Sequence, residues 1–246
     1  MGDCMKKYKS ILIFIFILAI CTLNYVSAEN KEYPLISKVI YLDPGHGNVD
    51  PGATYKGVYE SDLNLELSIE IMTELKKNGA TVYLTRYGDY DLSAVGAKNW
   101  KRSDLSRRAN IINKSGCDMF ISVHLNADES HTWYGAQVYY DSINPENEKI
   151  AKIMQEELKK NTNTTRDYQK NDTKYLQRRI NRPGVLLEAG FLSNDNERYL
   201  LKQDSYQQKL AKIITNSIII LNKISYKCVD TYEEIKRKIK EAQGEK

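Results

Sequence analysis

The chain has 246 residues and a formal net charge of +4, and it contains neither a basic domain nor an acidic tail. This balance argues against nucleic acid as a partner. Its length is enough for one domain with a substantial core, and only two of its four cysteines lie beyond residue 21, which excludes a disulfide framework.

The first 28 residues have the features of an export signal. Three lysines precede an unbroken apolar run over residues 11–21, and Val26-Ser27-Ala28 offers a cleavage site with small residues. The run is shorter than the roughly 20 residues that a membrane span needs. We therefore predict a signal peptide over 1–28 and no stable membrane span after its cleavage; a retained anchor is the alternative.

From residue 38 onward, short β-rich runs alternate with segments of helical periodicity. Strands are predicted at residues 38–42, 80–85, 119–123, 135–140 and 184–187. One helix is predicted from Ser61, as its N-terminal cap, to Asn78-Gly79, and others at 104–115, 147–160, 194–201 and 206–224. Residues 162–175 are polar and lack this periodicity, which predicts a surface loop.

Alternating strands and helices predict the fold class. They favour an α/β protein: a single domain with a mostly parallel, mixed central sheet covered by helices on both faces. We place this domain at residues 36–225. Residues 226–246 are charged and carry few apolar residues, so they form a separate C-terminal tail in this interpretation. The tail is either a marginal, solvated helix or a segment that docks on a partner.

Two of the three histidines follow predicted strands. His46 lies between two glycines in a turn, and His124 ends the apolar run over residues 120–123. A surface histidine in a turn is a sufficient explanation for His46 alone. Two histidines at strand ends together indicate a functional site, because α/β folds place their working groups there. His131 lies in a polar loop and is expected to be exposed to solvent.

Two glutamates complete the candidate site. Glu60 lies at a helix start, where the helix dipole alone could explain a carboxylate. Glu188 follows an apolar strand and precedes further nonpolar residues, so its pKa should be raised unless a cation lies nearby. Two imidazoles and one carboxylate are the ligand set of a catalytic zinc site, and a second carboxylate can serve as its proton shuttle.

Several ordered blocks of the chain resemble the zinc-dependent N-acetylmuramoyl-L-alanine amidases of peptidoglycan. The resemblance extends from about residue 39 to 221 and includes residues 42–47, 50–53, Glu60 with 63–65, 84–86, 107–110, 120–127 and 188–194. It implies that His46, Glu60 and His124 bind Zn²⁺ and that Glu188 is the catalytic glutamate. Between residues 161 and 182 the pattern of the family is hard to trace.

The resemblance also implies a reaction and a location. The cut would fall between the lactyl group of N-acetylmuramic acid and L-alanine of the stem peptide, with Glu188 moving a proton from water to the leaving nitrogen. A short chain with one catalytic domain is similar to the subgroup that acts on spore-cortex peptidoglycan, on the route to muramic lactam needed for germination. Export would deliver it to the cell wall or the spore-cortex compartment.

Other interpretations stay open at this point. A zinc carboxypeptidase or deacetylase could use the same ligands on a different bond, and a wall-binding or regulatory protein could keep a vestigial site. A regulatory protein partner could act on zinc occupancy through the tail. Arg107 or Arg108 could bind a peptide carboxylate, but we expect both to cover the surface of their helix.

Overall fold

The structure, a computed structural model, describes residues 15–16 and 32–242, without some side chains near the C-terminal end. The predicted signal peptide, apart from residues 15–16, lies outside the described residues. Within the described part of the chain, no helix is both long and apolar enough to cross a membrane. The chain divides into units at residues 1–33 and 34–246, and the fold described below is that of the second unit.

Six strands form the central sheet, in the order β4-β1-β5-β8-β6-β7. Neighbouring strands among the first four are parallel, β6 is antiparallel to β8, and β7 is parallel to β6. Their bounds are β1 Val39–Pro44, β4 Thr81–Leu84, β5 Met119–Asn126, β6 Gln137–Tyr140, β7 Gln169–Lys170 and β8 Gly184–Phe191. The predicted mostly parallel, mixed sheet is confirmed.

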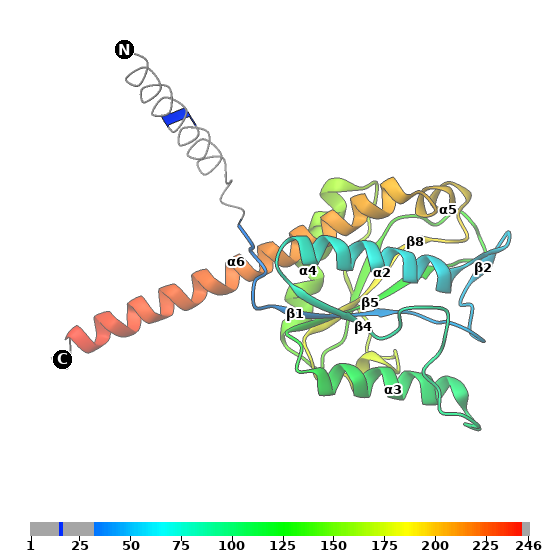
Figure 1. The fold of residues 1–246 in the computed structure, drawn as a ribbon, viewed down its shortest axis with the longest axis horizontal. Coiled ribbons are helices and arrows are strands. Elements are labelled where there is room, and N and C mark those ends of the chain that lie inside the picture. The colour runs from blue at the N-terminus through cyan, green and yellow to red at the C-terminus, as the bar shows by residue number, and fades with distance from the viewer. Residues whose placement is uncertain (1–14, 17–31, 243–246) are drawn as a thin grey trace, which may run out of the picture. The chain divides into compact units, whose positions relative to one another are not determined.

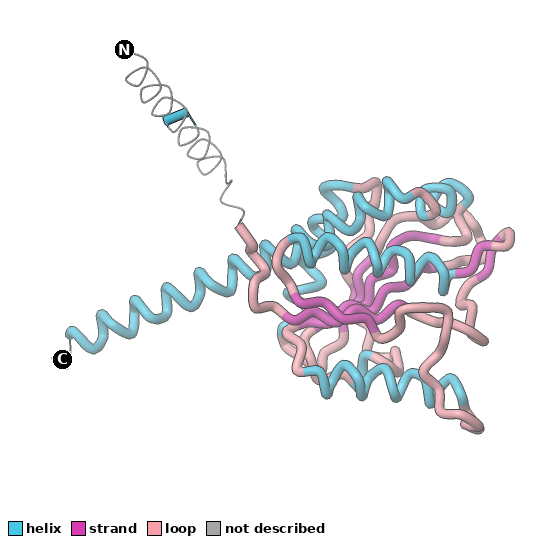
Figure 2. Tube along the Cα trace, viewed as in Figure 1, coloured by secondary structure: helices cyan, strands magenta, loops and turns pink. Residues whose placement is uncertain are grey.

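Helices cover both faces of this sheet, as predicted (Figures 1 and 2). One face carries α2 (Glu60–Lys77), α4 (Glu146–Asn161), α5 (Asp195–Leu201) and α6 (Asp204–Ala242), and the other carries α3 (Trp100–Ser115) and the short helix η1 (Gln177–Arg179). Successive strand residues face opposite sides, so Ile121 joins the larger core cluster and Phe120 the smaller one. The buried free thiol of Cys117 also belongs to the smaller cluster.

The central strands β5 and β8 extend three and four residues beyond their predicted ends, and this difference matters for the site. The sequence pattern ends the strands at residues 123 and 187, where the apolar runs stop. In the structure β5 continues to Asn126 and β8 to Phe191, with His124 and Glu188 paired in register. Backbone hydrogen bonds continue the ladder regardless of side-chain polarity, so both polar residues lie inside the sheet.

The last helix is longer than the sequence pattern predicts. We expected a helix at 206–224 and a separate tail, but α6 continues without interruption to Ala242. Its buried residues lie between Gln207 and Asn222, where it packs against α2 and α4. Beyond residue 225 the side chains that the structure describes are exposed. The core contacts therefore end near the predicted domain boundary, although the helix does not.

Candidate active site

The turn that carries His46 follows directly from β1. His46 has a φ of 64°, in the left-handed region that non-glycine residues rarely adopt. Two buried arginines hold the turn: Arg86 donates to the carbonyls of Pro44 and Gly45 at 3.0 and 2.9 Å, and Arg108 donates to those of Pro44 and His46, both at 2.7 Å. These bonds fix a backbone conformation that would otherwise be unfavourable.

Arg108 corrects one expectation from the sequence. Arg107 is exposed on α3 as predicted, but Arg108 is only 1% exposed and lies beneath the His46 turn. Its guanidinium pairs with Asp43 at 2.9 Å and with Asp104, one helical turn earlier, at 2.8 Å. The prediction of a surface position for Arg108 was wrong. Its guanidinium pairs with the buried carboxylate of Asp43, and because Asp43 lies on a strand distant in sequence, the pattern around Arg108 does not reveal this partner.

Glu60 is the first residue of α2, and a loop rather than a side chain caps this helix. We had predicted Ser61 as the N-cap, and this was wrong. The N-cap is Tyr59, whose side chain makes no capping hydrogen bond. Instead, the backbone N–H groups of Glu60 and Ser61 donate to the carbonyls of Ala53 and Pro51 at 2.9 and 3.0 Å. The loop that precedes the small hairpin of β2 (Thr54–Tyr55) and β3 (Val58–Tyr59) therefore sets the position of Glu60.

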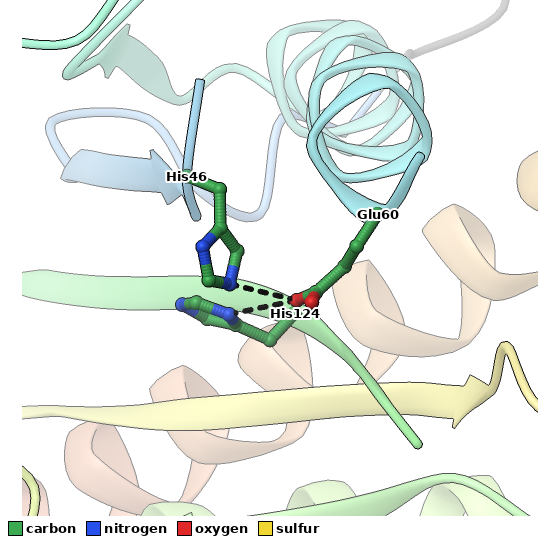
Figure 3. A group of neighbouring side chains, drawn as sticks. All are labelled: His46, Glu60 and His124. Atoms are coloured by element: carbon green, nitrogen blue, oxygen red, sulfur yellow. Dashed lines mark hydrogen bonds and ion pairs between the residues drawn. The ribbon is translucent and has the colours of Figure 1, made fainter. Parts of the chain in front are cut away.

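The carboxylate of Glu60 is the meeting point of the group (Figure 3). It is only 4% exposed, and its Oε1 lies 3.2 Å from His46 Nε2 and 3.0 Å from His124 Nδ1. The backbone N–H of Leu125 and the amide of Asn64 also donate to Oε1, each at 3.2 Å. Burial alone would raise the pKa of Glu60, but the two imidazoles lower it well below its usual range.

The two imidazoles come from β5 and from the turn after β1, and they meet edge to face. Their ring centroids are 4.9 Å apart with an angle of 80° between the planes. The second nitrogen of His46, Nδ1, lies 3.0 Å from Asp50 Oδ2. Burial opposes protonation of His46, but Glu60 and Asp50 raise its pKa above the usual value. A carboxylate on the far nitrogen is the usual orienting partner of a histidine that binds a metal.

Gly45 provides the space in which the ring of His124 lies. A Cβ on Gly45 would come within 2.2 Å of His124 Cε1 and 2.4 Å of Nε2. We expect Gly45→Ala to displace the imidazole and lower the rate of the reaction at this site about 10²-fold, as is typical when a group that positions a reaction moves by about 1 Å. Gly88→Ala is the matched control, because its Cβ would meet the Tyr90 ring at an ordinary 3.5 Å. Equal activity of the two variants would contradict this role for Gly45.

Glu188 lies beside this group, and one of its two carboxyl oxygens is unpaired within the described part of the chain. It is 8% exposed, and its Oε2 has no hydrogen-bond partner among the described residues. Burial raises the pKa of Glu188, and the charge of Glu60 adds to this, while His124, Lys174 and His46 act in the opposite direction. A buried carboxyl group with a free oxygen and a raised pKa is suited to accept and release a proton.

All four predicted site residues line one cleft of about 360 Å³ at the carboxyl ends of the parallel strands. The ligand atoms of His46, Glu60 and His124 lie within 4.8 Å of one another, so these three could hold a metal ion. Glu188 does not belong to this group of three. The third histidine, His131, is exposed as predicted, and its Nδ1 contacts the Ser193 carbonyl.

No pattern in the sequence indicated the opposite wall of the cleft. It consists of Lys101 and Leu105 from α3 and of residues 174–177 at η1. Four of these six residues lie in the segment 161–182, where the pattern of the family is hard to trace. The polar composition of residues 162–175 indicated only a surface loop, and no periodicity in the sequence marks which of its side chains turn inward.

The fold and the site define a class of protein: an α/β enzyme with a potential metal centre beside a buried carboxyl group, at the carboxyl edge of its sheet. The chain belongs to the N-acetylmuramoyl-L-alanine amidase family, whose model matches residues 40–219. It is therefore a hydrolase of the cell-wall amidase type.

Relatives of known structure or function agree with this family. The chain is 40% identical over 213 residues to the germination-specific N-acetylmuramoyl-L-alanine amidase of Bacillus subtilis, covering 83% of this chain and 90% of that protein. The CwlD amidase of Clostridioides difficile, solved in complex with the GerS lipoprotein, superimposes with a TM-score of 0.71 at 37% identity, covering 74% and 96% of the two chains. The catalytic domain of the CwlV amidase of Paenibacillus polymyxa superimposes with a TM-score of 0.65 at 28% sequence identity. The match covers 74% of this chain and 96% of that one.

Proposed function

We propose that this protein is a zinc-dependent amidase that cuts between the lactyl group of N-acetylmuramic acid and L-alanine of the stem peptide in peptidoglycan. The observation that carries the proposal is the convergence of His46, Glu60 and His124 within 4.8 Å, next to the unpartnered carboxyl oxygen of Glu188. Membership of the amidase family indicates which bond is cut, and the side chains in the cleft are those that its hydrolysis requires.

The donor set fits zinc. Two imidazole nitrogens and one carboxylate oxygen are the ligands of catalytic zinc sites with an open fourth position. Asp50, beside His46 Nδ1, would orient that ring, and the bonds from Leu125 and Asn64 would hold Glu60. When bound, zinc lowers the pKa of water to about 7 and polarises a carbonyl group.

Glu188 would carry out the proton transfer. Its carboxylate would accept a proton from the attacking water and pass it to the alanine nitrogen as the C–N bond breaks. The position in the cleft supports this role, because Glu188 pairs in register with His124 on the neighbouring strand. The same burial that raises its pKa keeps the proton available for the leaving group.

We place the protein's action at the cell wall or the spore cortex. The 40% identity to a germination-specific amidase supports cortex peptidoglycan as the substrate, on the route to muramic lactam, and the predicted signal over residues 1–28 would export the chain. A regulatory protein could dock on the second half of α6, whose described side chains are exposed. Deletion of residues 231–246 tests this docking site. If the shortened chain binds the regulatory protein as well as the full chain does, the docking proposal is contradicted.

Digestion of defined peptidoglycan, read by mass spectrometry, tests the proposed activity. We expect intact stem peptides and lactyl-bearing glycan as products, no product with a chelator, and recovery when zinc is added back. Shortened stem peptides would indicate a carboxypeptidase, and loss of acetyl groups a deacetylase. Full activity of a protein shown to be free of zinc would contradict the metal assignment.

A further inference from the structure

Arg166, which lies between α4 and β7, carries a positive charge that no carboxylate in the described part of the chain neutralises. Its side chain is half-buried and, unlike that of Arg108, forms no ion pair there. Its Nη2 makes no hydrogen bond to the described residues, yet this atom is not shielded from solvent. The guanidinium therefore has free N–H donors that a ligand arriving from solvent can reach.

The guanidinium of Arg166 is held in one orientation. Its Nε donates to the Tyr134 carbonyl at 2.8 Å, and its Nη1 donates to Gln137 Oε1 at 3.2 Å. Its Cζ lies 4.4 Å from the ring centroid of Phe191 and 5.1 Å from that of Trp133. These contacts leave Nη2 available at the edge of the plane. Because the group is already ordered, little conformational freedom is lost when a ligand binds it.

The acidic side chain that lies nearby is used elsewhere. Burial raises the pKa of Glu197, and the charge of Arg166 opposes this. The Oε2 atom of Glu197 accepts the backbone N–H groups of Phe191 and Gly135, at 2.7 and 2.9 Å. Glu197 therefore fixes the backbone around Arg166 without pairing with its charge.

Two of the contacts of Arg166 place it beside the catalytic cleft. Gln137 on β6 is the register partner of Glu188 on β8, and directly opposite residues of an antiparallel pair lie on the same face of the sheet. Phe191 is the register partner of Asn126, which lines the cleft. The guanidinium therefore borders the site on the side of β8 that is remote from the three converging residues.

Tyr139 gives a second indication of this position. It follows Gln137 by two residues on β6, so both side chains share one face, and its hydroxyl donates to Gln137 Oε1 at 2.9 Å. Burial raises the pKa of Tyr139, the charge of Glu188 adds to this, and the charge of Arg166 opposes it. The hydroxyl of Tyr139 therefore lies within the electrostatic reach of both groups.

A fixed guanidinium with free donors is suited to a carboxylate, which it can bind with two parallel hydrogen bonds. The N-acetylated sugars of a glycan carry no charge, whereas a stem peptide carries carboxylates. Neighbouring strands lie about 4.8 Å apart, and an extended peptide advances about 3.3–3.6 Å per residue. A carboxylate within the first few residues after the scissile bond can therefore reach from Glu188 to Arg166.

We propose that Arg166 binds a carboxylate of the stem peptide and selects acidic stem peptides as substrates. This inference rests on the proposed amidase function. It assigns a role in specificity to the segment 161–182, where the pattern of the family is hard to trace.

The test compares two muramyl peptides that differ only in their carboxylates, which are free in one and amidated in the other. Both are digested by the full chain loaded with zinc. For Arg166→Gln we expect KM for the free form to rise about 10-fold with kcat nearly unchanged, since a hydrogen bond to a charged group is lost. KM for the amidated form should stay within about 2-fold of the wild-type value, because neither partner of the ion pair is then needed.

Two further measurements support the same comparison. Lys152→Gln removes a positive charge from an exposed position of α4 and is the matched control, with no expected change on either peptide. The wild type by itself should show a KM about 10-fold lower for the free form than for the amidated form, and this preference should shrink as salt is added. This second measurement does not depend on the folding of any variant.

Three results would overturn the proposal. Equal KM values of the wild type for both peptides would show that no carboxylate is recognised. An equal loss of Arg166→Gln on both peptides would move its contact to a neutral part of the substrate. A lower melting temperature with an unchanged preference between the peptides would make Arg166 a support for the Tyr134 loop only. If the wild type cuts neither peptide, the amidase function itself fails, which is a distinguishable result.

Discussion

Replacing Glu188 with glutamine is expected to lower kcat on peptidoglycan by about 10²–10⁴-fold, the range that general acid–base groups contribute. Glutamine has nearly the same shape but cannot accept the proton of the attacking water. Because Glu188 is not one of the three converging residues, the zinc content of the variant should equal that of the wild type. Digestion rates and metal analysis on the same preparations measure both quantities.

The pH dependence and stability give independent readouts for Glu188. In the metal-free protein, burial raises the pKa of Glu188 above that of an ordinary glutamate. For a carboxyl group with a raised folded-state pKa, stability is lost as pH rises through that pKa. The metal-free Gln variant should therefore be more stable than the wild type at neutral pH, and this gain should disappear below about pH 4.

Glu156→Gln, at an exposed position of α4, is the control for these measurements. It should change neither the rate of digestion nor the pH dependence of the stability of the metal-free protein. If Glu188→Gln digests peptidoglycan as fast as this control, Glu188 is not the proton carrier and the assignment of the general base is wrong.

Replacing Arg108 with methionine is expected to lower the free energy of unfolding by about 3–5 kcal/mol, because it leaves a buried charge without its partner. Asp43 is fully buried and would retain only the hydroxyls of Thr85 and Ser122, which donate to it at 2.6 and 2.9 Å. The carbonyls of Pro44 and His46 would lose donors as well. Urea unfolding at neutral pH measures the loss, which is a large share of a typical stability of 5–15 kcal/mol.

The neighbouring Arg107 offers a matched control and pH supplies a second test. Arg107→Met, on the exposed side of the same helix, should change stability by no more than about 0.5 kcal/mol.

Burial opposes the ionisation of Asp43, but Arg108 and Thr85 lower its pKa. The stability that ionised Asp43 contributes is therefore fully present above the pKa of the unfolded state and is lost as pH falls through the pKa of the folded state. The deficit of Arg108→Met should therefore shrink in acid; a deficit independent of pH would contradict the ion-pair explanation.

Much of the fold could be predicted because its signals are local. Four-residue steps of leucine and isoleucine predicted α2, and the end at Asn78 is confirmed, with Gly79 at a φ of 93°. Apolar runs predicted the central strands β5 and β8. Their true ends were missed because ladder bonds between strands, not side-chain polarity, decide where a strand stops.

The candidate site was predicted unevenly for a similar reason. His124 and Glu188 stand out in the sequence because polar groups at the end of apolar strands need a function or a partner. His46 and Glu60 each had an ordinary explanation, and the family resemblance singled them out. Arg108 gave no signal of burial, because its partner Asp43 lies 65 residues earlier in the chain.

By itself, the sequence determined the α/β class, the order of its main strands and helices, the family and the four candidate residues of the site. These depend on periodicity and on motifs, which are properties of neighbouring residues. Only the tertiary structure decided that four nitrogen atoms converge on Glu60 Oε1, that Arg108 lies beneath the His46 turn, and that residues 174–177 border the cleft. Each of these is a contact between segments far apart in the chain, and burial at such a contact depends on how the layers pack, which no local pattern records.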